Sequence, residues 1–134
     1  MASIRKTVVI EKAPGEVWDA LRDVGALHTR LVVGFVTNCV LEEDARVVTF
    51  ANGMTVRELI LDVNDQERRV AWSAVGGQLT HHNASAQVFP APGNKTEVVW
   101  IADLLPNEVA PAIAEMIGQG LAAMKRTLEA RDGT

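Results

Sequence analysis

The sequence predicts an α+β fold in which a curved antiparallel sheet of seven strands wraps around one long C-terminal helix, with two short helices after the first strand. Two observations lead to this fold. Runs of strand-forming residues, separated by turn signals, fill the middle of the chain, and an apolar stripe at helical spacing follows them. An amphipathic helix must bury its stripe, and the apolar face of the sheet is the only large partner that the sequence offers.

The N-terminal segment predicts one strand and two short helices. The β-branched run "TVVIEK" (residues 7–12) is typical of a strand. Pro14 suits the first turn of a helix, because its missing N–H costs nothing there. Apolar residues then recur at helical spacing until Gly25, which is typical of a C-terminal stop. We expect a second short helix over residues 26–31.

Six further runs predict strands that are joined in succession by hairpins. Turn signals such as "ANG", "VGGQ" and "PAPGN" separate them. The predicted strands cover residues 34–42, 46–51, 54–63, 69–75, 80–89 and 95–104.

The last predicted element is a long helix that begins at Asn107 or Glu108, with Pro111 early enough to be tolerated. A helix of about 20 residues spans about 30 Å, which is enough to cross a sheet. Its apolar stripe consists of Val109, Ile113, Ile117, Leu121, Met124 and Leu128.

Composition predicts a soluble protein with a single domain over residues 1–134, since 48% of the residues are hydrophobic and 22% are charged. The net charge of −4 argues against a nucleic-acid partner, which usually needs a basic surface. No apolar run reaches transmembrane length, and no signal peptide precedes the first strand, so we expect a cytoplasmic protein without a membrane span. The one cysteine, Cys39, excludes an intramolecular disulfide.

The order of elements, together with "APGEVWDAL" (residues 13–21), resembles the START/Bet v 1-like superfamily, also called SRPBCC, and within it the polyketide cyclase/dehydrase and lipid-transport family. The resemblance covers almost the whole chain. It implies a helix-grip fold with an elongated cavity between the sheet and the long helix. The superfamily includes cyclases, hydrolases, lipid carriers and hormone receptors, so the fold leaves the activity open.

Two segments are also similar to the gate and latch of plant abscisic-acid receptors, namely "ANGM" (51–54) and "VGGQLTHHN" (75–83). The lysine that anchors the hormone's carboxylate in those receptors is replaced by Val33, and the gate proline is missing. These departures argue against a carboxylate-binding hormone receptor. The match implies pocket positions at Glu58, Trp72, Ala84, Ala86 and Val98.

Strand geometry separates the adjacent histidines, because neighbouring strand residues point to opposite faces. His82 shares a face with Ala84 and Ala86, and His81 shares the polar face. We expect the alanine row to face the helix. Its small side chains leave space that is either filled from the opposite side or left as a cavity, and the resemblance favours the cavity.

On the strand over residues 54–63, the match to the receptors places Met54 and Glu58 inward. The residues that alternate with them are more apolar, and this favours burial of the opposite face instead. On the last strand, Trp100 would face the helix. The outer row of that strand, which includes Val99, is unusually apolar, and an exposed apolar patch can mark a partner. A homodimer through the sheet is therefore one alternative.

No metal, cofactor or nucleophilic triad is predicted. A zinc site needs three or four converging ligands, and His81 and His82 diverge on a strand. The G-x-G-x-x-A pattern over residues 118–123 lies inside a helix, which is the wrong context for a dinucleotide. The sequence lacks G-x-S-x-G.

The sequence therefore predicts binding of a small, largely hydrophobic molecule, lipid-like or polyketide-like, between the sheet and the long helix. Glu58 and His82 would orient its polar end, and Met54 and Gln78 would lie at the entrance. The predicted ligand-binding residues are Met54, Glu58, Trp72, His82, Ala84, Ala86, Val98, Trp100, Ile117, Gly120 and Met124.

The alternative is an aromatase/cyclase-like enzyme in which Glu58 and His82 move protons on a polyketide-like carbonyl. Burial would raise the pKa of Glu58 unless a cation or hydrogen bonds offset it. Equally, Glu58 could form a structural pair near Arg57 or with His82. A third alternative is a non-catalytic module that dimerises through its sheet. A cavity of about 300 Å³ or more that contains both Glu58 and His82 would favour binding or catalysis.

Overall fold

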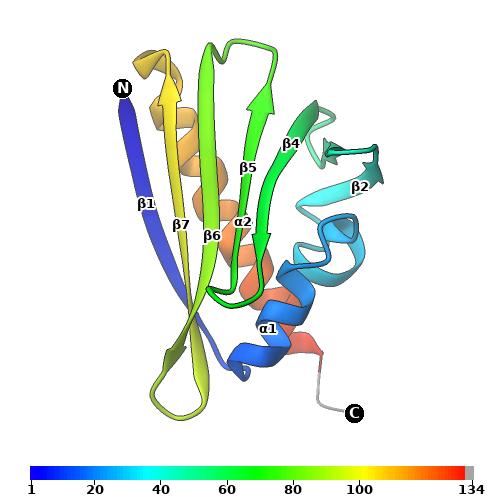
Figure 1. The fold of residues 1–134 in the computed structure, drawn as a ribbon, viewed down its shortest axis with the longest axis vertical. Coiled ribbons are helices and arrows are strands. Elements are labelled where there is room, and N and C mark those ends of the chain that lie inside the picture. The colour runs from blue at the N-terminus through cyan, green and yellow to red at the C-terminus, as the bar shows by residue number, and fades with distance from the viewer. Residues whose placement is uncertain (132–134) are drawn as a thin grey trace.

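A computed structural model describes residues 1–131. Within them, seven strands form one antiparallel sheet in the order β1-β7-β6-β5-β4-β3-β2. The sheet curves, and the long helix α2 runs along one of its faces (Figure 1). The strands are β1 (Ala2–Ile10), β2 (Val36–Leu41), β3 (Ala45–Phe50), β4 (Thr55–Asn64), β5 (Arg69–Val75), β6 (His81–Ala91) and β7 (Lys95–Leu105).

The strands from β2 to β7 follow one another as antiparallel neighbours, which confirms the predicted hairpin series. In the turn between β3 and β4, Gly53 has φ +89°, a left-handed conformation that glycine adopts without steric cost. The prediction for the first strand was wrong in its start, because β1 begins at Ala2 rather than at residue 7. Its polar N-terminal half is held by pairing with β7 along its whole length, from Ala2 opposite Leu104 to Ile10 opposite Thr96.

The helices are α1 (Pro14–Leu21), the π turn η1 (Leu27–Leu31), the 3-10 turn η2 (Asn107–Val109) and α2 (Ala110–Ala130). The second short helix is thus only a five-residue π turn. Arg30 of this turn forms ion pairs with Asp19 of α1 at 2.6 Å and with Asp23, just after α1, at 2.9 Å. The long helix starts at Ala110, later than expected, because the first three residues form η2.

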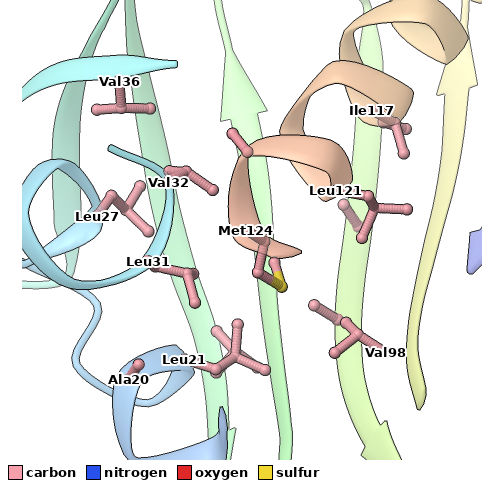
Figure 2. Packing of buried hydrophobic residues seen from close by; sticks show 14 of the residues in the cluster. Ala20, Leu21, Leu27, Leu31, Val32, Val36, Val98, Ile117, Leu121 and Met124 are labelled. Carbon is pink, nitrogen blue, oxygen red and sulfur yellow. The ribbon is translucent and has the colours of Figure 1, made fainter. Parts of the chain in front are cut away.

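The core lies between the concave face of the sheet and α2, with α1 and η1 closing one end. Ile117, Leu121, Met124 and Leu128 of α2 are all buried, as the stripe predicted. Figure 2 shows α2 side chains converging with those of α1, η1 and the sheet. Close packing of this kind leaves few voids, so any large hollow elsewhere in the layer needs an explanation.

The apolar outer row of β7 differs in exposure from one residue to the next. Val99 is only 6% exposed and lies between its cross-strand neighbours Thr7 and Gln87. Ile101, two residues further along the same row, is 38% exposed, so the apolar outer row of β7 is covered at Val99 and open to solvent at Ile101.

Candidate functional site

A cavity of about 560 Å³ lies between the sheet and α2. The sheet side of its wall comes from β2 to β7, and the opposite side comes from α2 and from η1 with the loop that follows it. This volume falls within the range of about 300–1,000 Å³ that small-molecule sites occupy. Most of the lining side chains are aliphatic or aromatic, and they include Phe35, Phe50 and Met116, which the sequence did not single out.

The structure brings most of the sequence-predicted site residues to this cavity. Gln78, expected at the entrance, lies on its wall too, next to the turn formed by Gly76 and Gly77. On β4, Glu58 faces the cavity, whereas Leu61 is 49% exposed on the other face, so the inward row is the one that the match implied. The predicted residues on the wall are Met54, Glu58, Trp72, His82, Ala86, Trp100, Ile117 and Met124.

Three predicted residues, Ala84, Val98 and Gly120, lie off the wall. Ala84 pairs with Ala102 across β6 and β7, and both are buried, so the small side chains permit close packing here rather than leaving a hollow. Val98 is completely buried in the packed core (Figure 2). A Cβ added to Gly120 would lie 2.9 Å from the Trp100 ring, so this glycine lets the helix backbone rest on that ring.

Val33 also lies outside the lining of the cavity and is 47% exposed. Its backbone N–H donates to Oγ1 of Thr127 at 3.0 Å. The absence of a lysine at this position therefore says nothing about the charge of a ligand, and the exclusion of a carboxylate ligand has to rest on the residues that do face the cavity.

The ionisable side chains of the wall, with Ala74 between two of them, form a row across four strands. Arg46 of β3 pairs with Glu58 of β4, and Glu58 pairs with Ala74 of β5. Next to Ala74, Nδ1 of His82 on β6 accepts a hydrogen bond from the Ala74 backbone N–H at 2.9 Å. Ala74 lies between Glu58 and His82, and both of these side chains face the cavity. We call Arg46, Glu58 and His82 the polar row.

Arg46 is the charged residue of the cavity wall that sequence reasoning missed. Its Nε donates to Oε1 of Glu58 at 2.8 Å, with the two side chains 4% and 10% exposed. Its Nη1 donates to the carbonyl of Val24 at 3.2 Å, and its guanidinium carbon lies 5.3 Å from the ring centroid of Trp72, within cation–π range. Arg46 is thus the cation that offsets the burial of Glu58.

A signal for Arg46 was present in the sequence. With the hairpin turn at "ANG", residues equally distant from the turn face one another, which brings Arg46 opposite Glu58. The alternative partner Arg57 points away and pairs with Glu42 at 3.0 Å, where both side chains are about half exposed.

His82 is 8% exposed and is held as a neutral imidazole. Burial lowers its pKa below the ordinary value, and the charge of the neighbouring His81 lowers it further. Because Nδ1 accepts the Ala74 N–H, the ring proton is on Nε2. The backbone carbonyl of His82 accepts a hydrogen bond from Oγ of Ser73, which fixes the start of β6 against β5.

In chemical terms, the site can hold an apolar body and hydrogen-bond one polar group. Among residues 1–131, no group of three or more His, Cys, Asp and Glu side chains is arranged to hold a metal ion. None of the helices in the same part of the chain is both long and apolar enough to span a bilayer.

Comparisons with known proteins agree with this arrangement. A family model described as "Polyketide cyclase / dehydrase and lipid transport" matches residues 1–129. An uncharacterized protein from Bacillus thuringiensis is 20% identical, with a TM-score of 0.85 and coverage of 95% of this chain and 98% of that one. No curated protein matches the chain.

Two further solved structures carry descriptive names. A START superfamily protein from Mycobacterium smegmatis is 11% identical, with a TM-score of 0.73 and coverage of 96% of this chain and 95% of its own. A point mutant of norcoclaurine synthase from Thalictrum flavum, in complex with a transition-state analogue, is 18% identical, with a TM-score of 0.71 and coverage of 96% and 92%. At these identities the likeness shows the fold alone, and it confirms the helix-grip fold.

Proposed function

The chain belongs to the polyketide cyclase/dehydrase and lipid-transport family, and from this premise we propose that it binds one small, largely hydrophobic molecule between the sheet and α2. The observation that carries the proposal is the cavity of about 560 Å³ with mostly apolar walls and one row of ionisable side chains. An apolar molecule that leaves water for such walls gains about 25 cal/mol for each Å² that it buries.

The polar row supports binding rather than proton transfer. A general base needs a lone pair that can take a proton from the substrate. Oε1 of Glu58 is bound to Arg46, and Nδ1 of His82, the basic nitrogen of its neutral ring, is bound to the Ala74 N–H, so that only Oε2 of Glu58 is left free to accept. Groups held in this way orient a ligand, because their rotamers are already fixed before the ligand arrives.

The experiment is a titration of the purified protein with the neutral fluorophore N-phenyl-1-naphthylamine, together with native mass spectrometry of co-purified molecules. We expect saturable binding of one fluorophore per chain. Val56→Phe, on the cavity wall, should weaken that binding about tenfold or more, because the added ring occupies the space of the ligand.

Leu59→Phe is the matched control. It lies on the same strand next to the inward-facing Glu58, so its side chain points to the opposite face. Circular dichroism would verify that both variants fold. The proposal fails if no saturable binding occurs and no co-purified molecule is found, or if both variants bind as the unmodified protein does.

A further inference from the structure

We propose that the ligand of this cavity carries a neutral oxygen function, an alcohol or a carbonyl, at the polar row, and that the Arg46–Glu58 pair selects it against a carboxylate. This inference rests on the proposed function and names the class of molecule that the cavity accepts.

The first support is the charge of the lining. Among the described residues that line the cavity, Arg46 and Glu58 are the only charged pair, and their atoms Nε and Oε1 are 2.8 Å apart. The remaining ionisable group of the lining is the neutral imidazole of His82. The cavity therefore carries no net charge, and a carboxylate would enter as an uncompensated anion in an apolar surrounding, which is strongly unfavourable.

The second support is the hydrogen-bonding capacity that the protein leaves unused. Among the hydrogen bonds within residues 1–131, Arg46 uses Nε and Nη1, Glu58 uses Oε1, and the His82 ring uses Nδ1. Donors therefore remain at Nη2 of Arg46 and Nε2 of His82, and an acceptor remains at Oε2 of Glu58. A carbonyl can accept from the donors, and a hydroxyl can also donate to Oε2. An alkyl ammonium could use only Oε2 and would add an uncompensated positive charge.

A change of one charge in the row should reverse this preference. Glu58→Gln keeps the shape of the side chain and an oxygen that can accept from Nε of Arg46, but it leaves the guanidinium without a counterion. A carboxylate ligand would then supply the missing charge. The double variant Arg46→Gln with Glu58→Gln again carries no net charge and should prefer neutral ligands.

The test measures displacement of bound N-phenyl-1-naphthylamine, near neutral pH, by four probes with the same ten-carbon chain: 1-decanol, 2-decanone, decanoate and decylammonium. For the unmodified protein we expect the alcohol or the ketone to bind at least about tenfold more tightly than either ion. Glu58→Gln should tighten decanoate at least about tenfold. The control Glu42→Gln removes an exposed carboxylate outside the cavity and should change nothing.

The outcomes separate this inference from the proposed function. If the fluorophore binds but decanoate displaces it as well as decanol does, or no decyl probe displaces it, the inference is wrong and the proposed function stands. If the fluorophore does not bind and no co-purified molecule is found, the proposed function fails and the inference with it; if only a co-purified molecule is found, a carboxylate or an ammonium group on that molecule overturns the inference alone. If Glu58→Gln does not fold, the order of the four probes on the unmodified protein decides.

Discussion

Two parts of the sheet face that α2 covers differ in how closely they contact the helix. On the side of β1 and β7, α2 packs directly on the sheet, and Ile4, Val98 and Ala102 are buried in that contact. On the side of β3, β4 and β5, the inward side chains line a cavity instead. Both sides present mostly apolar residues, so hydrophobicity alone does not distinguish a packed layer from a hollow one.

The size of the facing residues explains part of this difference. The paired alanines Ala84 and Ala102 lie on the packed side, where small side chains allow the layers to approach. Large side chains form much of the cavity wall, among them Trp72 and Trp100, whose ring centroids are 5.5 Å apart in an edge-to-face arrangement. Small residues permit the close contact at Ala84 and Ala102, but Ala86 on the same strand lines the cavity, so residue size alone does not decide which part is packed.

The largest expected effect comes from breaking the polar row on the cavity side. Arg46→Met leaves the buried Glu58 without its cation and should lower the free energy of unfolding by about 3–5 kcal/mol. Adding Glu58→Met should restore most of that loss, since no buried charge remains. Urea unfolding measures both. Arg57→Met, which breaks the exposed pair with Glu42, should cost less than about 1 kcal/mol; equal losses for Arg46 and Arg57 would contradict a buried pair.

The packed and hollow sides can be compared with one substitution made on each. Val98→Ala should cost about 2–3 kcal/mol, because it opens a new void in a fully buried site. Val56→Ala should cost only about 1 kcal/mol, since it enlarges a cavity that already exists. The midpoints of thermal or urea unfolding decide. The distinction between the two sides would be lost if Val56→Ala proved as costly as Val98→Ala.

Two glycines of α2 test how closely the helix approaches the wall. Gly120→Ala should cost about 1–3 kcal/mol and narrow the cavity, because its Cβ would lie 2.9 Å from the Trp100 ring. Gly118→Ala should instead stabilise by about 0.5–1 kcal/mol, because its Cβ would meet only the mobile end of Lys6, at 3.4 Å, and alanine favours the helix. Unfolding and fluorophore titration of both variants measure this, and a stabilising Gly120→Ala would contradict the close approach.

The smallest effect is a pH dependence that comes from His82. Its pKa is lowered in the folded protein by burial, so as pH falls through about 6.5 the unfolded chain takes up a proton before the folded one does. This contribution to stability is present above that pH, is lost as pH falls, and stops changing below the folded pKa. His82→Gln should therefore reduce the loss of unfolding free energy that occurs as the pH falls. His81→Gln should leave most of that loss in place. Identical pH profiles for the unmodified protein and His82→Gln would refute the assignment.

The sequence by itself determined the order of elements and the faces of the strands. Period-two alternation separated His82 from His81 and grouped it with the inward alanines, and the stripe from Ile117 to Leu128 predicted the buried face of the helix. These are local properties, because the direction of a side chain follows from its own strand or helix. The resemblance added that a cavity lies between the layers and that Glu58 faces it.

Only the tertiary structure decided which inward residues meet the cavity and which are packed. Ala84 and Ala86 share one face of one strand, yet Ala86 lines the cavity and Ala84 packs against a neighbouring strand. The polar row likewise depends on strand register, which brings Arg46 to Glu58 and the His82 ring to Ala74. Whether space between two layers is filled depends on how closely elements distant in sequence approach, and neither periodicity nor composition encodes that separation.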